Sequence, residues 1–171
     1  MDEEVDHVRG PTAGGLILEY GDYECAYSRQ AFWAIECVDQ ELSRRVRFAF
    51  RHFPLVQIHP HAFGAAAAAE AAALQGCFWG MHELLFQSQK ALEDDDLLQY
   101  AEQLGLDVAR FDEDRVGPEV RRRIRRDVES GLASAEVRGT PTLFIDGVVY
   151  VGAYDAPSLI AALLEKCSEC T

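Results

Sequence analysis

The stretch from residue 16 to residue 53 constrains the fold most, because it holds two strand-like runs separated by one helical stripe. Residues 16–20 are rich in β-forming side chains, and residues 46–53 alternate in polarity with a period of two. Between these runs, residues 25–43 carry apolar side chains at helical spacing. Strands joined through a helix are normally parallel, with a right-handed crossover. The pattern therefore predicts a βαβ unit.

The rest of the chain divides into a helical block and a closing ββα unit. Helical periodicity runs through the block in segments near 62–74, 78–90, 94–104 and 118–134. The runs 142–145 and 148–151 flank Asp146-Gly147, which is a strong hairpin signal, and 155–166 has the pattern of an amphipathic helix. This order, βαβ…ββα, predicts an α/β sandwich interrupted by an all-helical insertion.

The predicted domain boundaries follow from these patterns and from one change in composition. Residues 1–14 are acidic and then rich in Gly, Pro and Thr, so we expect a loose lead-in, with the fold starting after it. A length of 171 residues suits one domain with one core. We assign residues 15–59 and 136–166 to the α/β domain, 60–135 to the helical insertion and 167–171 to a tail.

The charge balance excludes some classes of partner. Lys and Arg total 16 against 29 Asp and Glu, and the net charge of −13 argues against attraction to nucleic acid or to an anionic membrane. No apolar run approaches the ~18 residues of a membrane span, and the first residues lack the basic start and apolar run of a signal peptide. We therefore expect a cytoplasmic protein with no nucleic-acid and no membrane partner.

The chain has five cysteines, and position singles out one of them. An odd number leaves at least one thiol free or used between molecules, and in a reducing compartment each cysteine is by default a small buried hydrophobe. Cys25 differs because it lies where a strand is expected to end and a helix to begin. Unpaired N–H groups and the positive helix end would favour its nucleophilic thiolate, whereas the nearby Asp22 and Glu24 oppose it.

The segment around Cys25 resembles the active-site segment of the DsbA-like branch of the thioredoxin superfamily, whose motif is Cys-Pro-Tyr-Cys or a close relative. Further similarities span residues 7–163 and comprise Arg51-His52-Phe53-Pro54-Leu55, His59-Pro60-His61-Ala62, Gln75-Gly76, Phe78-Trp79, Gly139-Thr140-Pro141-Thr142 and Phe144-Ile145-Asp146-Gly147. On these motifs the chain is identified as a bacterial-type member of the branch. The resemblance implies a thioredoxin-like sandwich with a helical insertion, and thiol-disulfide oxidoreductase activity.

The resemblance also implies roles for individual residues. Cys25 is then the nucleophile, and Pro141 is expected in the cis form beside it. Glu19 corresponds to a semi-buried acid that relays protons, the alternative being a strand-end acid that faces water. The segment before Pro141 would hold an extended peptide by strand addition. The expected substrate contacts are Ala26, Tyr27, Arg138, Gly139 and Thr140.

Two positions depart from the family motif: Ala26 stands where proline is frequent, and Ser28 where the second cysteine is usual. A hydroxyl cannot form a disulfide, so exchange stops at a mixed disulfide until another thiol resolves it. Three explanations compete: a native monothiol enzyme resolved by a small thiol, a cysteine-to-serine trapping variant with impaired cycling, and a member that has left redox chemistry. The additional change at Ala26 favours natural divergence.

The sequence therefore predicts thiol-disulfide exchange through Cys25 with protein or small-molecule thiols and disulfides. Glutathione is a candidate co-substrate, and no resident cofactor or metal is expected. One alternative is a glutathione-dependent transferase or isomerase, because relatives with this inserted fold use a serine near the same place. Another is a redox-inactive peptide-binding or chaperone-like module that kept the groove.

Three further patterns have weaker interpretations. Cys167 and Cys170 have redox or metal spacing without a second ligand pair, so we interpret them as an incidental tail, with a resolving pair or half a metal site as alternatives. The arginines at 121–123 and 125–126 are interpreted as a solvated helix face paired with an acidic surface, rather than an anion or nucleic-acid site. His59 and His61 are interpreted as loop residues at the entry to the insertion.

Overall fold

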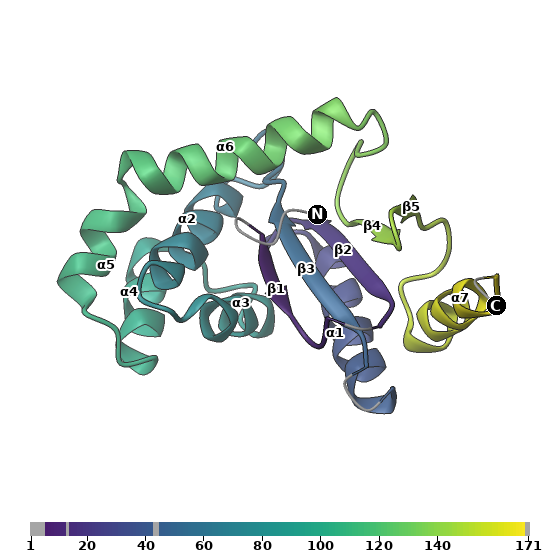
Figure 1. The fold of residues 1–171 in the computed structure, drawn as a ribbon. Helices are drawn as coiled ribbons and strands as arrows, with labels where there is room; N and C mark the ends of the chain where they lie inside the picture. Colours follow the sequence, from purple (N-terminus) through teal and green to yellow (C-terminus); the bar gives the residue numbers. More distant parts are fainter. Residues whose placement is uncertain (1–5, 13, 43–44, 170–171) are drawn as a thin grey trace.

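The computed structural model describes residues 6–12, 14–42 and 45–169, and it forms one mixed sheet with helices packed around it (Figure 1). Along the chain the elements are β1 (His7–Arg9), β2 (Leu16–Gly21), α1 (Ala26–Glu41), β3 (Arg47–His52), α2 (Ala62–Ala73), α3 (Phe78–Gln87), α4 (Asp94–Gln103), α5 (Val108–Arg115), α6 (Pro118–Ala133), β4 (Thr142–Ile145), β5 (Val148–Val149) and α7 (Ala156–Glu169). The predicted fold class, an α/β sandwich with a helical insertion between β3 and β4, is confirmed.

The sheet has the strand order β1-β3-β2-β4-β5, so β2 is its central strand. β2 runs parallel to β3 and is joined to it through α1, which is the predicted βαβ unit. β4 pairs antiparallel with β2, and Tyr20 lies opposite Thr142. The hairpin between β4 and β5 turns at Asp146 and Gly147, whose φ angles of 48° and 81° are those that a tight hairpin turn requires.

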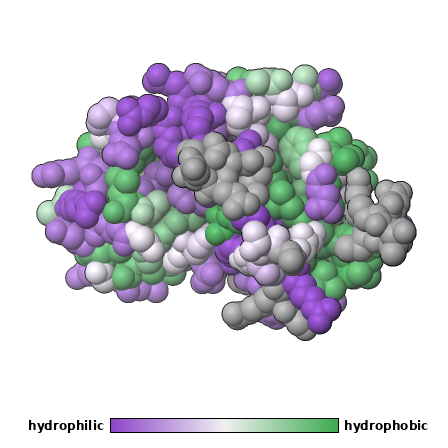
Figure 2. Space-filling model, viewed as in Figure 1, coloured by the Kyte–Doolittle hydropathy of each residue, from purple (hydrophilic) through white to green (hydrophobic). Residues whose placement is uncertain are grey.

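Side chains alternate between the two faces of the sheet, and different helices cover each face. Ile17 and Ile145 belong to the main core, which α1, α7 and the helical insertion complete. Tyr20 and Phe144 belong to a smaller cluster that includes Val128 of α6. Figure 2 shows hydrophilic residues over the upper left of the visible face, around α5 and α6, and apolar residues toward the β4–β5 end. The central strand is therefore covered on both faces.

α2 is the centre of the helical insertion, because it packs against α3, α4, α5 and α6. Its small side chains allow this close approach, and five of them are fully buried: Ala65, Ala68, Ala69, Ala71 and Ala72. The sequence does not predict α5. That helix is short and only Phe111 in it is buried, so it lacks a repeating apolar stripe. Asp107 fixes its start by accepting the backbone N–H of Arg110.

A buried ion cluster fastens α6 to the sheet. The carboxylate of Asp127 is fully buried and accepts the backbone N–H of His52 at 3.1 Å. The same carboxylate pairs with Arg123 and, at 3.0 Å, with Arg126. Two of the five clustered arginines therefore face inward and neutralise a buried charge.

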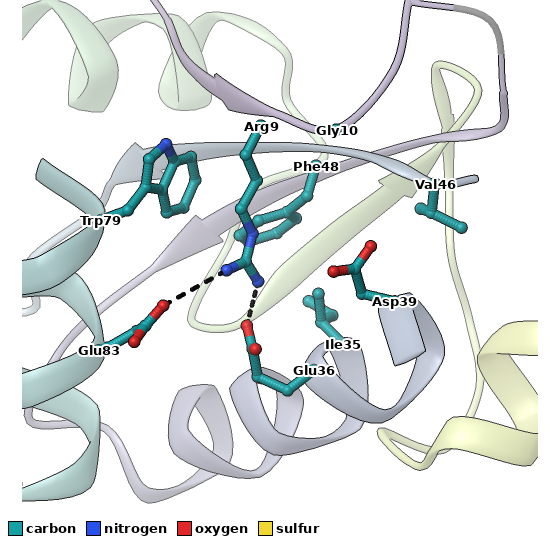
Figure 3. A pocket seen from close by; sticks show the side chains of 9 residues that line it. All are labelled: Arg9, Gly10, Ile35, Glu36, Asp39, Val46, Phe48, Trp79 and Glu83. Carbon is teal, nitrogen blue, oxygen red and sulfur yellow. Dashed lines mark hydrogen bonds and ion pairs between the residues drawn. The ribbon is translucent and has the colours of Figure 1, made fainter. Parts of the chain in front are cut away.

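The start of the chain corrects one prediction. The fold does not begin after residue 14, because His7–Arg9 form β1, antiparallel to β3. Three residues are too few for a periodic signal, and side-chain contacts hold the strand instead. The Arg9 guanidinium lies 5.3 Å and 4.9 Å from the ring centroids of Phe48 and Trp79. It also pairs with two carboxylates on α1 and α3, Glu36 and Glu83 (Figure 3). Residues 1–5 and 13 of the predicted lead-in lie outside the described residues.

The end of the chain differs from the prediction in two places. β5 covers only Val148–Val149, although the sequence pattern extends to residue 151. α7 continues to Glu169, past the predicted end at residue 166, so Cys167 is within the helix. The side chain of Cys167 and the whole of Cys170 lie outside the described part of the chain.

Among the described residues, no helix combines the length and apolar character that crossing a membrane requires.

Candidate active site

Cys25 caps the amino end of α1, directly after β2 and a short turn. Its backbone is extended, with φ −76° and ψ 120°, and its N–H donates to the carbonyl of Asp22 at 3.1 Å. The first amides of a helix have no partner within the helix and carry the positive end of its dipole. The side chain is 5% exposed. The structure thus places a thiol at a helix end that favours an anion.

The loop that leads into β4 lies against this sulfur. The Thr140–Pro141 peptide bond is cis, and the Cys25 S–H donates to the carbonyl of Thr140 at 3.2 Å. Thr142 closes the loop by donating from Oγ1 to the carbonyl of Gly139 at 2.8 Å. Residues 115 positions apart in the sequence therefore meet at the thiol.

Ser28 lies one helical turn beyond Cys25 and is fully buried. Its hydroxyl accepts the backbone N–H of Asp22 at 3.3 Å, so it helps to close the turn before Cys25. Cys25, Cys37 and Cys77 are free thiols in the described part of the chain. The motif therefore provides one sulfur and a structural hydroxyl.

Asp22 organises the turn, a role that the sequence did not reveal. Its carboxylate is buried and accepts three N–H groups, each at 2.8 Å, from the backbones of Glu24 and Leu55 and from Nδ1 of His59. His59 is therefore a loop residue, as predicted, but its loop is fastened to the turn that carries Cys25. The available signal was only an acid three residues before the cysteine, which does not identify a partner 37 positions away.

The helical insertion contacts the same turn from two sides. The side-chain amide of Gln89, just after α3, donates to the carbonyls of Tyr23 and Cys25 at 2.7 and 2.8 Å. The carboxylate of Glu24 accepts the backbone N–H of His61 at 2.7 Å, just before α2. The insertion therefore fixes the backbone on which the thiol is mounted. Gln89 lies in a loop and gave no sequence signal.

Glu19 is a fully buried acid on β2, and neither of its carboxylate oxygens has a hydrogen-bond partner among the described residues. The alternative of an acid facing water is therefore wrong. Burial raises the pKa of Glu19 to about 8, against a smaller opposing effect of the Arg9 charge. A carboxyl that holds its proton near neutral pH can donate and accept one in that range.

Tyr154 is a second residue that the sequence analysis missed. Its hydroxyl donates to the carbonyl of Pro141 at 2.9 Å, so it supports the proline loop next to Cys25. Burial, and then the negative charges of Glu19 and Cys25, raise the pKa of Tyr154. A tyrosine in a loop after a hairpin has no sequence pattern that marks such a contact.

The predicted substrate contacts lie around this centre at different depths. Ala26 and Tyr27 are exposed, and Tyr27 retains 64% of its accessible surface. Arg138 is exposed, whereas Gly139 and Thr140 are half-buried. The structure brings the Thr140 carbonyl to the thiol, and the roles of the others in substrate binding stay predictions.

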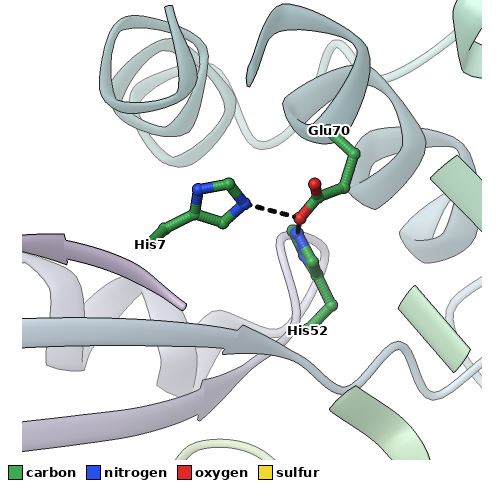
Figure 4. Close-up of side chains that lie close together, drawn as sticks. All are labelled: His7, His52 and Glu70. Carbon is green, nitrogen blue, oxygen red and sulfur yellow. Dashed lines mark hydrogen bonds and ion pairs between the residues drawn. The ribbon is translucent and has the colours of Figure 1, made fainter. Parts of the chain in front are cut away.

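One further cluster has the donor set of a metal site. Nε2 of His7 and Nε2 of His52 each lie 2.8 Å from the same oxygen of Glu70 (Figure 4). Two histidines and a carboxylate suit zinc. However, Nε of Arg123 is 3.9 Å from that oxygen. Nδ1 of His52 is buried and has no hydrogen-bond partner in the part of the chain that the structure describes, whereas ligating histidines normally donate their second N–H.

The Glu70 cluster is better explained as a structural junction of β1, β3 and α2. Burial raises the energy of the ionised carboxylate, but the hydrogen bonds from His52 and His7 outweigh it and hold the pKa of Glu70 well below its usual range.

A separate hollow of about 430 Å³ beside Arg9 is lined by carboxylates and rings (Figure 3). Cys25 does not line this hollow, so we do not assign the reaction to it.

Comparison with known proteins identifies the fold and the sequence family. The model of the DSBA-like thioredoxin domain family matches residues 59–164, which include Pro141 and the helical insertion. A thioredoxin-like oxidoreductase from Silicibacter pomeroyi is 25% identical, with a TM-score of 0.80 over 96% of this chain and 92% of that one. BdbD from Bacillus subtilis, in its oxidised form, has a TM-score of 0.82 at 18% identity and covers 96% and 94% of the two chains.

Curated relatives are longer proteins. Na(+)/H(+) antiporter NhaA 1 of Mycolicibacterium vanbaalenii is 44% identical over 166 residues. Na(+)/H(+) antiporter NhaA 3 of Salinispora tropica is 44% identical over 165 residues. These matches cover 95% and 96% of this chain but only 27% and 25% of the relatives. The chain thus spans about a quarter of the length of the curated relatives it matches.

The raised pKa of Glu19 predicts a specific pH dependence of folding. The folded state holds this proton up to about pH 8, whereas the unfolded chain releases it near the ordinary value of 4.5. The stabilisation is therefore complete below about pH 4.5 and is lost as the pH rises through about 8. At 1.36 kcal/mol for each pKa unit, it amounts to at most about 5 kcal/mol.

Glu19→Gln should remove this slope, since an amide does not titrate. In urea unfolding, the stability of the variant relative to the parent should rise by a few kcal/mol, on the order of 3, between pH 5 and pH 8.5. Glu129→Gln, at an exposed position on α6, serves as the matched control and should show no such rise. Parallel pH profiles for the parent and the Glu19 variant would contradict the assignment.

Proposed function

This chain belongs to the DSBA-like thioredoxin domain family, and we propose that it catalyses thiol-disulfide exchange with Cys25 as its single reacting sulfur. The observation that carries the proposal is the position of Cys25, at the amino end of α1 and 3.2 Å from the Thr140 carbonyl. Ser28 occupies the place where a resolving sulfur would stand in the same helix. A hydroxyl there leaves the second step of the reaction to an external thiol.

The proposed cycle has two displacements, and each exchanges one S–S bond for another. In the first, the Cys25 thiolate attacks a disulfide, forms a mixed disulfide and releases the other sulfur as a thiolate. In the second, an external thiolate attacks the mixed disulfide and frees Cys25. We assign the second step to glutathione or to a protein thiol, and glutathione suits a reducing, cytoplasmic setting.

We further propose that Glu19 exchanges protons with the reacting sulfurs. Two observations support this role: the carboxyl is buried without a hydrogen-bond partner among the described residues, and its pKa is raised to about 8. Such a group can take up the proton of a thiol and return it to a leaving thiolate near neutral pH. An ordinary carboxyl would already be ionised in that range.

The substrate backbone is proposed to pair with the segment that precedes Pro141. Arg138 is exposed there, and a side chain added at Gly139 would meet open space, so an extended chain can approach this edge. Strand addition supplies main-chain hydrogen bonds independent of the substrate sequence. The exposed ring of Tyr27 lies on α1, two residues after Cys25, and offers an apolar contact to the same substrate.

The curated relatives favour a second proposal, which concerns the partner. In them, a segment like this chain makes up about a quarter of a protein named as a Na(+)/H(+) antiporter. A thiol held in the same chain as a potential substrate acts at a high effective concentration, of the order of millimolar for short linkers. We therefore propose thiols of such a transporter as one physiological substrate of Cys25.

The single-sulfur cycle predicts the oxidised form of the protein. Oxidised glutathione should leave one glutathione adduct, on Cys25, that persists until an external thiol is added, because Ser28 cannot displace it. Ser28→Cys should lose the adduct by closing an internal disulfide. Intact-mass and peptide-mapping measurements on both proteins check this outcome.

Two results separate this cycle from its competitors. Cys25→Ser should abolish the adduct, whereas Cys77→Ser should leave it unchanged. A parent protein that instead loses two hydrogens and links Cys25 to another cysteine uses a remote resolving thiol, which would rule out the single-sulfur cycle.

The partner proposal predicts a cross-link that thiols can reverse. The antiporter portion of the Mycolicibacterium vanbaalenii relative, reconstituted in vesicles and activated at its thiols as mixed disulfides, should couple to the parent chain and not to the Cys25→Ser variant. Coupling no faster than that of an unrelated activated membrane protein of equal thiol content would remove this partner.

A further inference from the structure

We propose that a groove between the β3–α2 loop and α6 binds an acidic, partly apolar segment of the proteins whose sulfur reacts with Cys25. This inference rests on the proposed exchange function and adds to it a class of substrate. We call this site the arginine groove, and the residues that line it include Pro54, Val56, Phe63, Ile124, Arg121 and Arg125.

The arginine groove has an apolar interior and a cationic rim. It has a volume of about 390 Å³, which is within the range of pockets that bind small ligands or single side chains. Ile124 is buried at its base, whereas Val56 is 49% exposed on one wall. An exposed valine next to a concave apolar surface is a position that a bound side chain would cover.

Four of the five clustered arginines of α6 form two groups in the structure, and the fifth, Arg122, is exposed outside both. Arg123 and Arg126 face inward and pair with Asp127. Arg121 and Arg125 line the groove, and neither has an acidic partner among the described residues. The Arg121 guanidinium lies over the ring of Phe63, 5.8 Å from its centroid, which fixes one cation at the rim. The inward group therefore pairs with a buried carboxylate and not with the acidic surface that the sequence pattern had predicted.

The Arg121 and Arg125 cations determine the chemistry of the occupant, although Nε of Arg121 also donates to the backbone carbonyl of Val116 at 3.3 Å. The chain carries a net charge of −13, so these two arginines beside an apolar hollow are opposite in sign to the net charge of the molecule. At about 0.1 M ionic strength, charges more than about 10 Å apart are largely screened. A group bound in the groove is therefore attracted by the two nearby arginines more than it is repelled by the net negative charge of the chain. A peptide with carboxylates beside an apolar side chain complements both features.

The groove is connected to the reactive thiol through the backbone. Its wall at 54–57 is part of the loop whose Leu55 N–H donates to the carboxylate of Asp22 at 2.8 Å. The carbonyl of Asp22 in turn accepts the N–H of Cys25 at 3.1 Å. A protein segment that flanks the reacting cysteine can therefore lie in the groove, on the side of the turn where the β3–α2 loop is fastened.

The test compares disulfide exchange with three probes, each a cysteine carried as its disulfide with thionitrobenzoate. The Cys25 thiolate attacks the cysteine sulfur, the mixed disulfide forms and coloured thionitrobenzoate leaves. One probe is a peptide with leucine and glutamates beside the cysteine, the second replaces the glutamates by lysines, and the third is N-acetylcysteine without a peptide. Arg121→Gln combined with Arg125→Gln should slow exchange with the glutamate peptide by roughly threefold to tenfold, the range of two exposed ion pairs.

The control is Arg122→Gln, which removes one positive charge from the same helix at an exposed position that does not line the groove, and it is compared with Arg121→Gln and Arg125→Gln as single variants as well as with the double variant. The control and the double variant should react with the lysine peptide and with N-acetylcysteine at the parent rates. Equal losses on both peptides, or an equal effect of the control, would overturn the groove as the binding site. Absence of exchange at Cys25 with N-acetylcysteine would instead remove the proposed function, and this inference with it.

A second copy of the chain is the competing occupant, because its acidic surface could also meet the arginines. Sedimentation of the parent and the double variant distinguishes the two. A parent dimer that the double variant abolishes, with unchanged peptide rates, would assign the groove to self-association and overturn the peptide proposal. If the parent and the double variant are both monomers, and the double variant reacts more slowly with the glutamate peptide alone, the peptide proposal is supported.

Discussion

The antiparallel pairing of β2 with β4 is the contact on which the candidate site depends. β2 leads into the turn and Cys25, and the Thr140–Pro141 segment leads into β4, so opposing Tyr20 and Thr142 brings these two segments together. The thiol then meets the Thr140 carbonyl across 115 positions of sequence. The helices between β3 and β4 must bring the chain back to the sheet so that β4 can pair with β2. The buried Asp127 contributes to this, because its hydrogen bond to His52 holds α6 against the end of β3.

Two buried acids next to this strand pairing, Asp22 and Glu19, differ in their hydrogen bonding. The carboxylate of Asp22 accepts three N–H groups and so fixes the conformation of the turn before Cys25. Glu19 has no hydrogen-bond partner among the described residues, and burial raises its pKa to about 8. One carboxylate is therefore held in hydrogen bonds within the turn, whereas the other is the group for which we propose proton transfer. The difference comes from the loop between β3 and α2, since Leu55 and His59 in that loop donate to Asp22, and Glu19 has no such donor among the described residues.

Local patterns in the sequence were sufficient for four of the five strands, for most helices and for the position of Cys25 before a helix, because alternation, helical stripes and a strand-to-helix junction are features of neighbouring residues. They failed for β1, which is three residues long and held by the contacts of Arg9, and for α5, which has no apolar repeat. Gln89 and Tyr154 were missed for the same reason: each contributes one hydrogen bond or two to a segment far away in the sequence. Such contacts depend on tertiary packing, which single-sequence periodicity does not encode.

We propose that position, not exposure, makes Cys25 the most reactive sulfur of the chain. Exposure alone ranks the thiols in the opposite order, because Cys25 is 5% exposed whereas Cys37 is an exposed residue on α1. The direct measurement is the rate of iodoacetamide alkylation at each cysteine at pH 6, mapped by mass spectrometry in the folded protein and again in urea. Cys25 is expected to react fastest in the folded protein, and this advantage should disappear on unfolding. Faster alkylation of Cys37, Cys77, Cys167 or Cys170 in the folded protein would contradict it.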